Sequence, residues 1–412
     1  MEDMEWIEGG VCAAKGFKAA GVEVGIKAGH TGKKDMAMLY SEKACVAAGT
    51  FTSNLVKAAP VKWDQKVVKE SDSVQAIVIN SGVANACTGQ KGIDDCERLA
   101  KKTAEVTGIS KEAVLVCSTG VIGAKLPTDK METGIEKLVP LLEESKEAAT
   151  TAAQAIMTTD TIDKQVAVRF TVGGKEVHLG GMCKGSGMIH INMCTMLGFI
   201  TTDAAISKKM LQNALSETIP DTFNMVSVDG DTSTNDTVLL LANGLAENDC
   251  ICEKNEDYET FRQALFAVCE ALSKKIASDG EGATKLLEVK VIHATSKQDA
   301  VTLSKSIVTS SLTKAMVYGN DANSGRVLCA MGYSGVVFDP ERVDIWLESE
   351  KGKIKIVENG MYADYSEEEA TELFKTKAVT ILADVKMGEE TATAWGCDLT
   401  YDYVKINADY RS

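Results

Sequence analysis

The sequence has no long apolar run. A membrane-spanning helix needs about 20 consecutive, mostly apolar residues, and no stretch of the chain approaches that length. The chain starts with MEDMEWIEGG, which is acidic and lacks the basic start and apolar run of a secretory signal peptide. We therefore expect a cytoplasmic protein with no membrane partner.

A basic surface is also missing. The chain carries 44 lysines and arginines against 59 aspartates and glutamates, a formal net charge of −15. Binding to the phosphates of nucleic acid depends on a surplus of Lys and Arg on one face. The acidic balance argues against a nucleic-acid partner, and it favours solubility without fixing the fold.

Disulfide and metal-binding patterns are absent as well. Twelve cysteines are scattered through 412 residues without a CxxC pair, and only Cys250 and Cys252 lie close together. A chain of this length is too large for the disulfide frameworks of small secreted domains, so we expect mostly small, buried, apolar cysteines in a reducing compartment. The histidines are too dispersed for a convincing zinc site, and they are His30, His178, His190 and His293. We predict neither a metal nor a bound cofactor.

Strand and helix patterns intermix along the chain, and no long polar linker divides it. A length of 412 residues suggests two or three folding units at about 150 residues each. Short apolar runs predict buried strands, and apolar residues recurring every three or four positions predict helices. The mixture indicates an α/β class, or α+β with layered sheets. The expected strands are 76–79, 113–116, 238–241, 287–292, 379–385 and 399–406, the expected hairpin is 166–179, the expected helices are 94–105 and 257–276, and a capping box is expected at Ser366 and Glu369.

The densest chemical signal lies in residues 180–199. Four glycines fall within 180–187, and an apolar run follows. Glycines allow positive φ and close approach of the backbone. A Gly-rich turn beside Lys184 is able to cradle a phosphate, but its spacing does not match the P-loop. Composition alone leaves two interpretations open, a nucleotide-binding loop and a tight turn that enters a core strand, and it favours the turn.

The order of residues in this segment resembles the cleavage segment of a known enzyme family. The ornithine acetyltransferase, or glutamate N-acetyltransferase, family carries KGSGMIHPNMATM, and Lys184–Met196 repeats it with two departures. Ile191 replaces the usual proline, which frees the local backbone and could slow cleavage. Cys194 replaces the usual alanine but is still small, so cleavage should survive. Further matches span essentially the whole chain, at 9–11, 15–17, 52–54, 58–60, 80–82, 84–89, 118–123, 157–161, 227–236, 278–285, 321–323 and 398–407.

The resemblance implies a self-cleaving enzyme of the arginine biosynthesis bifunctional type. The chain is expected to cut itself between Cys194 and Thr195, which gives an α subunit, residues 1–194, and a β subunit, residues 195–412. By family precedent these fragments assemble as a heterotetramer. The implied fold is α/β, a DmpA/ornithine acetyltransferase-like fold with two intimately joined domains.

By the same resemblance, the enzyme moves an acetyl group from N2-acetylornithine to glutamate in arginine biosynthesis. Cleavage leaves Thr195 with a hydroxyl and a free α-amine. An α-amine has a pKa of about 7.7–8.0, so it can act as the base for the hydroxyl nucleophile. An acetyl-Thr195 intermediate would then pass its acetyl group to glutamate in ping-pong order. Some members of the family also accept acetyl-CoA as donor, and no feature of this sequence decides between the two types.

The resemblance assigns the remaining site residues too. The oxyanion is expected to be bound by the Thr119 hydroxyl and the Gly120 N–H. Lys184 suits a substrate carboxylate and Glu281 suits a substrate ammonium. Without the resemblance, Thr119 and Gly120 form an ordinary strand end, and Lys184 and Glu281 are solvated surface charges. The substrate contacts implied are Thr161, Lys184, Thr195, Glu281, Asn407 and Ser412.

Other interpretations stay open beside this one. Asp229, Asp231 and Asp236 carry the oxygen ligands that a hard cation prefers, but they lack the EF-hand order, and a turn is favoured. His190 stands five residues before Thr195 and could assist it, although a purely structural histidine is favoured. Two different classes remain as alternatives, an N-terminal-nucleophile amidohydrolase or aminopeptidase that passes its acyl group to water, and a non-catalytic nucleotide-binding protein.

Overall fold

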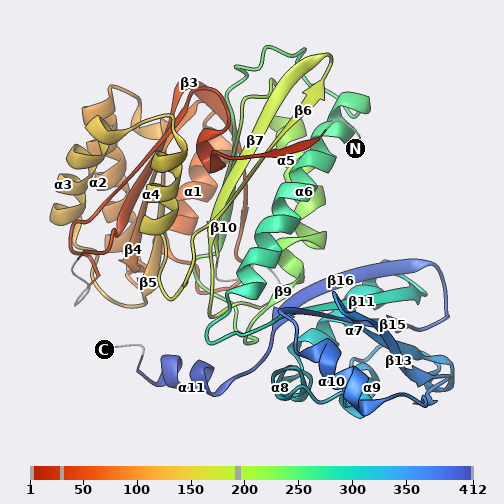
Figure 1. The fold of residues 1–412 in the computed structure, drawn as a ribbon. Coiled ribbons are helices and arrows are strands. Elements are labelled where there is room, and N and C mark those ends of the chain that lie inside the picture. The colour runs from red at the N-terminus through yellow and green to blue at the C-terminus, as the bar shows by residue number, and fades with distance from the viewer. Residues whose placement is uncertain (1–3, 28–31, 191–195, 410–412) are drawn as a thin grey trace. The chain divides into compact units, whose positions relative to one another are not determined.

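Residues 4–27, 32–190 and 196–409 are the part of the chain that the computed structural model describes. They fall into two compact units, each of which is described by itself (Figure 1). Unit 1 takes its residues from Met1–Gly185, Asn192–Phe223 and Thr232–Leu272, and unit 2 takes its residues from Ser186–Ile191, Asn224–Asp231 and Ser273–Ser412. Both units draw on both sides of residue 194, so the predicted subunits, 1–194 and 195–412, do not coincide with these two units, and they stay a prediction.

Unit 1 consists of one large sheet and the helices that cover it. Its elements in chain order are β1 (Glu5–Ile7), β2 (Phe17–Val22), β3 (Met36–Phe51), α1 (Ala59–Glu70), β4 (Val74–Val83), α2 (Gly89–Thr107), β5 (Val114–Val121), α3 (Thr128–Leu138), α4 (Lys146–Ala155), β6 (Lys164–Val172), β7 (Lys175–Lys184), β8 (Leu197–Thr202), α5 (Lys208–Thr218), β10 (Thr237–Ala242) and α6 (Glu256–Ser278), whose last turns belong to unit 2.

Nine strands among the described residues form the sheet of unit 1. Their order is β1-β6-β7-β8-β10-β3-β4-β5, and β2 also pairs with β3. The pairs β4–β5 and β8–β10 are parallel, whereas β7–β8 and β10–β3 are antiparallel. In β4, Ile77 and Ile79 face one core cluster while Ala76 and Val78 face another. This alternation is what a strand buried on both faces requires.

β3 folds the sheet over on itself. Residues 36–41 of this strand pair with β2 and β4, and residues 46–51 pair with β10. The register shifts between Tyr40 and Cys45, and Figure 1 shows the strand turning over at the top of unit 1. Because of this turn, side chains from both halves of the sheet, such as Ile77 and Phe199, share one core cluster.

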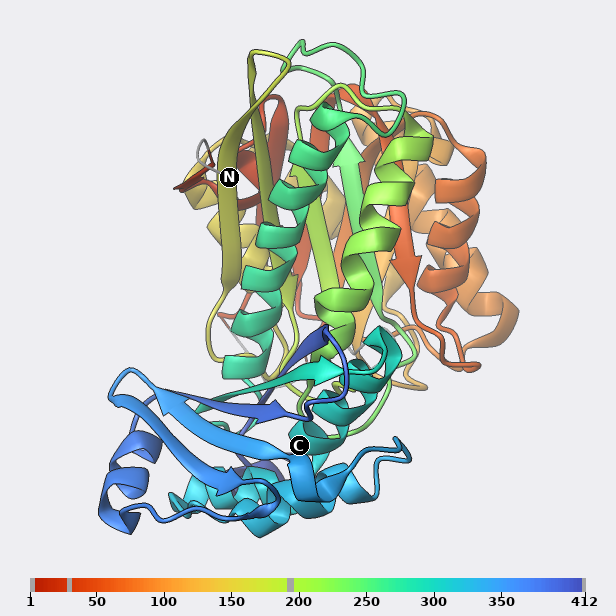
Figure 2. The same ribbon diagram turned by 90° about the vertical axis from the view of Figure 1, so that its right-hand side faces the viewer.

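Helices cover the outer faces of the folded sheet. α2 and α3 lie on the β4–β5 half, where Leu99 and Ile135 are fully buried in one cluster with Val78. α6 lies against β7, since a side chain at Gly181 would overlap that of Leu272. Figure 2 shows α5 and α6 side by side across the strands. The sheet is therefore buried on both faces, as expected for an α/β class.

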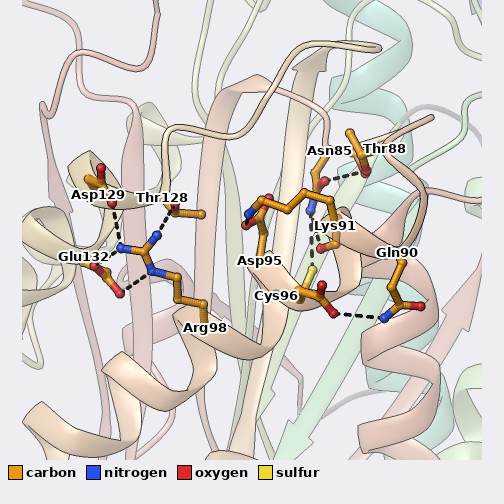
Figure 3. Close-up of polar contacts among 12 residues, drawn as sticks. Asn85, Thr88, Gln90, Lys91, Asp95, Cys96, Arg98, Thr128, Asp129 and Glu132 are labelled. Carbon is orange, nitrogen blue, oxygen red and sulfur yellow. Dashed lines mark hydrogen bonds and ion pairs between the residues drawn. The ribbon is translucent and has the colours of Figure 1, made fainter.

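Arg98 ties α2 to α3 at the surface (Figure 3). Its guanidinium donates to Glu132 at 2.8 Å, to Asp129 at 2.7 Å and to the Thr128 hydroxyl at 2.8 Å. Exposed ion pairs of this kind contribute about 0–1 kcal/mol each. The buried Leu99 on the same helix contributes more, because fully burying a Leu side chain is worth about 1.5–3 kcal/mol.

Unit 2 is built on a second sheet. Its strands follow the order β14-β13-β12-β15-β11-β16-β9, with β11 parallel to β15 and antiparallel to β16. The elements are β9 (Val226–Ser227), β11 (Leu286–Ala294), α7 (Lys297–Thr309), α8 (Ser311–Gly319), α9 (Ser324–Gly332), β12 (Asp344–Ser349), β13 (Gly352–Glu358), β14 (Met361–Tyr362), α10 (Glu367–Phe374), β15 (Ala378–Asp384), β16 (Glu390–Cys397) and α11 (Tyr401–Ala408).

Two mixed sheets with helices confirm the predicted α/β class, and most expected elements are present. The hairpin at 166–179 is β6–β7, and its turn uses Gly173 and Gly174, which both have positive φ. The strand expected at 113–116 begins one residue later, because Ala113 ends a short 3-10 turn. Ser366 caps α10 by accepting the Glu369 amide, as predicted.

The strand predicted at 399–406 is wrong, because this segment forms α11. Its alternating residues suggested a half-buried strand, yet Tyr401 and Val404 are 84% and 66% exposed. The preceding strand, β16, already has β11 and β9 as neighbours, so no sheet edge is open beside it. The helix instead begins after Thr400, and the Asn407 side chain bonds back to the Tyr403 carbonyl one turn earlier.

Cysteine burial agrees with the prediction. Among the described cysteines all are free thiols, and most are buried, the exposed ones being Cys87, Cys250, Cys252 and Cys329. Cys194 lies outside the described residues. No helix in the described ranges combines the length and the apolar character that a bilayer crossing demands.

Candidate active site

The carboxyl ends of β4 and β5 bring two glycines together. In this parallel pair Ser81 lies opposite Thr119, and Gly82 lies opposite Gly120. Gly120 has a φ of +129°, and a Cβ on it would lie 2.2 Å from the Gly82 carbonyl carbon. Only glycine fits this approach and this backbone conformation. Thr119, the first of the two predicted oxyanion donors, is buried at 5% exposure beside it.

Buried hydrogen bonds hold the backbone on both sides of Thr119. The Ser118 hydroxyl donates to Asn80 Oδ1 at 2.6 Å, and Asn80 Nδ2 donates to the Val83 carbonyl at 2.9 Å. Ser81 donates its hydroxyl to the Ala155 carbonyl at 2.6 Å. These bonds involve buried groups that have no access to water, so the strand ends that carry Thr119 and Gly120 are fixed rather than frayed.

The loop that follows β4 is fixed to the start of α2. Asn85 Nδ2 donates to the Gly92 carbonyl at 3.0 Å, and the Thr88 hydroxyl donates to Asn85 Oδ1 at 2.8 Å (Figure 3). Asn85 has a φ of +51°, a conformation that asparagine tolerates better than most residues. The fully buried side chain therefore holds the loop between Val83 and the helix in one conformation.

Lys184, at the end of β7, belongs to a buried charge cluster. Asp160 Oδ1 accepts Lys164 Nζ at 2.7 Å and the Gly185 amide at 2.8 Å, while Lys184 Nζ lies 4.0 Å from Asp160 Oδ2. Burial alone would raise the pKa of Asp160, but the charges of Lys184 and Lys164 outweigh it and lower this pKa to about 2. Two lysine side chains therefore face one carboxylate in this buried cluster. Thr161, the next residue after Asp160, is exposed.

The segment that holds the predicted cleavage site joins two neighbouring strands. Lys184 pairs with Leu197 across β7 and β8, and Cys194 and Thr195 lie between them, outside the described residues. Met196, which follows Thr195, is described and is held at both of its peptide groups. Its N–H donates to Asp236 Oδ1 at 3.0 Å, and its carbonyl accepts the Thr237 amide at 3.1 Å.

Asp236 is fully buried, and one of its oxygens stays without a hydrogen bond. Oδ1 accepts the Met196 amide, but Oδ2 has no partner among the described residues. The nearby Thr52 hydroxyl donates to the Ser233 carbonyl at 2.8 Å. Burial raises the pKa of Asp236 well above its usual range, against the opposing effects of the Met196 amide, the Thr52 hydroxyl and the Lys184 charge.

Asn235, the residue before Asp236, binds both strand ends that flank the predicted oxyanion donors. Its Nδ2 donates to the Ala84 carbonyl at 2.6 Å and to the Ser118 carbonyl at 2.8 Å. The Ser118 carbonyl belongs to the peptide bond that enters Thr119. One dipeptide in unit 1 thus contacts the residue after the predicted nucleophile and the residue before the predicted oxyanion donor.

Unit 2 contains the predicted residues Glu281 and Asn407, and it brings them together. Asn407 Nδ2 donates to Glu281 Oε2 at 2.7 Å, and Glu281 is buried at 7% exposure. The Glu281 amide donates to the Ser186 carbonyl at 2.9 Å, and a Cβ at Gly187 would overlap the Glu281 carboxyl. The Gly-rich segment therefore packs directly on Glu281, which explains the need for glycine at 187. Ser412 lies outside the described residues.

Two of the three aspartates that suggested a cation site, Asp229 and Asp236, accept backbone amides. Asp229 accepts the Met188 amide at 2.6 Å and the Ile189 amide at 2.9 Å, as an aspartate in a turn does. Asp236 accepts the Met196 amide. Within residues 4–27, 32–190 and 196–409, no group of three or more His, Cys, Asp or Glu side chains is arranged to hold a metal ion. The bonds of Asp229 agree with the turn that the sequence favours at this position.

His190 has a structural contact in unit 2. Its Nδ1 lies 3.1 Å from the Ser227 Oγ, and the two residues form an isolated β-bridge. Burial, with a further contribution from Lys305, lowers the pKa of this imidazole below its usual value. The contact with Ser227 and the β-bridge fix the chain just before the cleavage segment.

Asn235 and Asp236 were missed as site residues by sequence reasoning. They belong to the 227–236 match to the family, and Asp236 was considered only as a cation ligand. Their significance depends on contacts with residues far away in the chain, Ser118 and Met196 among them. The signal that could have found them was the unbroken run of small polar residues Ser233–Asp236 directly before a strand.

Comparison with known proteins shows which family the chain belongs to. A model of the ArgJ family matches residues 18–412. The chain is 52% identical over 409 residues to an arginine biosynthesis bifunctional protein ArgJ from Caldanaerobacter subterraneus, covering 99% of this chain and 100% of that protein. It is 45% identical over 406 residues to the protein of the same name from Bacillus subtilis, covering 98% and 97%. The chain belongs to the ArgJ family.

Two solved structures of related proteins are similar over about half of the chain. An arginine biosynthesis bifunctional protein from Bacillus halodurans is 48% identical, covers 50% of this chain and 96% of its own, and has a TM-score of 0.48. An ornithine acetyltransferase complexed with ornithine from Mycobacterium tuberculosis is 36% identical, covers 47% and 99%, and has a TM-score of 0.42. Membership of the ArgJ family makes this chain an enzyme of arginine biosynthesis.

Proposed function

We propose that this ArgJ-family chain is a glutamate N-acetyltransferase. It transfers the acetyl group of N2-acetylornithine to glutamate and releases ornithine and N-acetylglutamate. Thr195 is the nucleophile, and the chain becomes active by cutting its own Cys194–Thr195 bond. The observation that carries the proposal is the anchoring of Met196, the residue after Thr195, by buried Asp236 and by Thr237 at the start of β8 and β10.

The self-cleavage proceeds in two steps. The Thr195 hydroxyl attacks the Cys194 carbonyl carbon, the peptide C–N bond breaks, and the acyl group moves from nitrogen to oxygen. Water then hydrolyses the resulting ester, which leaves a carboxylate on Cys194 and a free amine on Thr195. Gly185 and Gly187, on the approach to this bond, support the proposal because they allow the bend that the attack needs.

The transfer itself follows ping-pong order. The Thr195 hydroxyl gives its proton to its own α-amine and attacks the acetyl carbonyl of N2-acetylornithine. The tetrahedral oxyanion is bound by the Thr119 hydroxyl and the Gly120 N–H, donors on a strand end that buried hydrogen bonds hold in place. The C–N bond breaks, the leaving nitrogen takes the proton, and ornithine departs. The amine of glutamate then attacks acetyl-Thr195 and restores the hydroxyl.

Charge complementarity supports the substrate contacts. The Lys184–Asp160–Lys164 cluster sets two lysine side chains against one carboxylate in a buried setting, which suits the α-carboxylate shared by both substrates. Glu281, oriented by Asn407, suits the side-chain ammonium that N2-acetylornithine has and glutamate lacks. Thr161 and Ser412 complete the proposed contacts as neutral hydroxyl groups. No metal or cofactor takes part in these steps.

Three further proposals follow from family membership. The fragments 1–194 and 195–412 stay together and form a heterotetramer, the enzyme is cytoplasmic, and acetyl-CoA is a candidate second acetyl donor. An assay of acetyl-CoA with glutamate decides the last point. An amidohydrolase would instead release acetate, so acetyl transfer to glutamate is expected to exceed acetate release by a wide margin.

Purified wild-type and Thr195→Ala proteins test the proposal. The wild type should give two bands on a denaturing gel, of 194 and 218 residues, and should form N-acetylglutamate. Thr195→Ala should give one uncut chain without turnover, and Thr195→Ser, which keeps a hydroxyl, should retain both reactions at reduced rates. An uncut wild type that transfers acetyl groups at full rate, or an active Thr195→Ala, would overturn the proposal.

A further inference from the structure

Asn235 and Asp236 contact two parts of unit 1 that come from distant segments. Asn235 is 6% exposed and Asp236 is fully buried. Both lie directly before β10, whose first residue, Thr237, also binds the Met196 carbonyl. Because β8 and β10 are parallel neighbours, their amino ends lie side by side, and Met196 directly precedes β8 at this end.

The Asn235 amide is fully used. Its two N–H groups donate to the Ala84 and Ser118 carbonyls, and its Oδ1 accepts the Thr234 hydroxyl at 2.6 Å. The Ala84 carbonyl directly follows β4 and the Ser118 carbonyl lies in the second half of β5, so one side chain sets the spacing of these two neighbouring segments. The Ser118 carbonyl is in the same planar peptide group as the Thr119 nitrogen. Its position therefore fixes the orientation of the peptide plane that leads into Thr119 and Gly120.

In the Asp236 carboxyl, by contrast, only one of the two oxygens accepts a hydrogen bond from a described residue. Oδ1 accepts the Met196 amide, and Oδ2 has no hydrogen-bond partner among the described residues. A buried oxygen without a partner costs free energy, and such groups call for a reason other than stability. Its location supplies one, since the carboxyl holds the amide of the residue bonded directly to Thr195.

We propose that Asn235 and Asp236 are positioning residues that set the nucleophile against its oxyanion donors, Asn235 through the Ser118 carbonyl and Asp236 through the Met196 amide. This inference rests on the proposed function of Thr195, Thr119 and Gly120. Neither residue has to touch the substrate. Nucleophilic attack requires the reacting atoms to be placed within a fraction of an ångström, and a misplacement of about 1 Å can cost about 10²-fold in rate.

A double-mutant cycle between Asn235 and Thr119 tests the first half. Asn235→Ala should lower kcat by about 10²-fold and leave the KM for N2-acetylornithine within a few-fold. In a Thr119→Ala background the same change should have little further effect, because the donor it positions is already gone. The matched control is Asn243→Ala. Asn243 is another buried asparagine that follows the carboxyl end of β10, and its Nδ2 donates to the Lys15 carbonyl at 2.8 Å. It should leave kcat unchanged.

Variants of Asp236 test the second half. Asp236→Asn keeps both the size of the side chain and an acceptor for the Met196 amide, so it should still cut its chain and keep kcat within about tenfold. Asp236→Ala should cut slowly and lose about 10²-fold in kcat, and its Met196 amide should exchange with deuterium faster than in the wild type. If the alanine variant does not fold, Asp236→Leu fills the site without an acceptor. Asp203→Ala is the matched control. Asp203 is a buried residue that follows the carboxyl end of β8, and its carboxylate accepts the His178 amide at 2.7 Å.

The outcomes separate this inference from the proposed function. Independent, multiplicative effects of Asn235→Ala and Thr119→Ala would overturn the role of Asn235. Equal losses in Asp236→Asn and Asp236→Ala, or a folded Asp236→Leu with unchanged kcat, would overturn the role of Asp236. A wild type that does not transfer acetyl groups refutes the proposed function itself, and deuterium exchange of the Met196 amide still decides whether Asp236 holds this residue.

Discussion

Lys184 and Leu197 lie opposite each other in the antiparallel strands β7 and β8. The segment between them, 185–196, includes the proposed cleavage site, so a cut there would leave its two new ends next to paired strands. β7 belongs to the proposed α fragment, and β8 belongs to the β fragment. β10, also of the β fragment, pairs with β3 of the α fragment. The sheet of unit 1 is therefore shared between the two fragments.

Cleavage should not separate the fragments. Six backbone pairs join β7 to β8, from Leu179–Thr202 to Lys184–Leu197, and six more join β3 to β10. We expect the fragments 1–194 and 195–412 to elute together in native size-exclusion chromatography and to separate only in denaturant. The uncut Thr195→Ala protein provides the reference elution volume. Elution of a lone β fragment under native conditions would contradict the shared sheet.

The predicted oxyanion donor Thr119 can be tested by substitution. Thr119→Ala should lower kcat by about 10²–10³-fold while the fold stays intact. Thr103→Ala is its control, since the hydroxyl of this buried threonine in α2 donates to the Leu99 carbonyl of its own helix. A Thr119→Ala enzyme with wild-type kcat would remove Thr119 from the mechanism.

Gly120 carries a structural prediction of its own. Gly120→Ala places a Cβ 2.2 Å from the Gly82 carbonyl carbon at a φ of +129°. We expect it to lower the free energy of unfolding by more than about 1–3 kcal/mol, the cost of backbone strain alone. Gly123→Ala isolates that strain, because Gly123 has a φ of +81° and open space around its Cβ. Equal losses in chemical denaturation of both variants would show that the contact with Gly82 is unimportant.

Much of the fold could be predicted because its signals are local. The short apolar run Ala76–Ile79 predicts β4, and the paired glycines at 173–174 predict the β6–β7 turn. The order of residues around Lys184 is enough by itself to predict the family. The roles of Asn235 and Asp236 could not be predicted, because their partners, Ser118 and Met196, lie far away in the chain. Composition cannot tell a cation ligand from an acceptor for a backbone amide.

The error at 399–406 has a different cause. The alternation of Leu399, Tyr401 and Tyr403 has the period of a strand, but a strand also needs a free edge to pair with. β16 has neighbours on both sides, and that information is not local. The segment becomes a helix whose Asn407 reaches Glu281, so the misassigned element carries one of the predicted substrate contacts.

The proposed carboxylate contact can be tested at Lys184. Lys184→Met should raise the KM for both N2-acetylornithine and glutamate, because both present an α-carboxylate, and should lower kcat less than KM rises. Removing this charge should also raise the pKa of Asp160, which Lys184 and Lys164 hold at about 2. Lys175→Met, at the exposed start of the same strand, is the control. Unchanged KM values for Lys184→Met would exclude the contact.

Asp64 should make the stability of the protein depend on pH. Burial raises its pKa from 3.8 to about 8, against hydrogen bonds from the Val116 amide and the Cys117 thiol. The folded state therefore holds a proton that the unfolded state loses above about pH 4, so the stabilising contribution is complete below that pH and declines as pH rises towards 8. Asp64→Asn, which does not titrate, should gain Tm relative to the wild type between pH 5 and 8. Parallel curves would contradict the raised pKa, and the exposed Asp72→Asn serves as control.

Intact-mass spectrometry of the enzyme quenched with N2-acetylornithine in the absence of glutamate tests the central claim most directly. We predict that the fragment beginning at Thr195 gains the mass of one acetyl group, that peptide mapping places it on Thr195, and that adding glutamate removes it. A wild-type enzyme that forms N-acetylglutamate while residues 195–412 never carry an acetyl group would contradict the account.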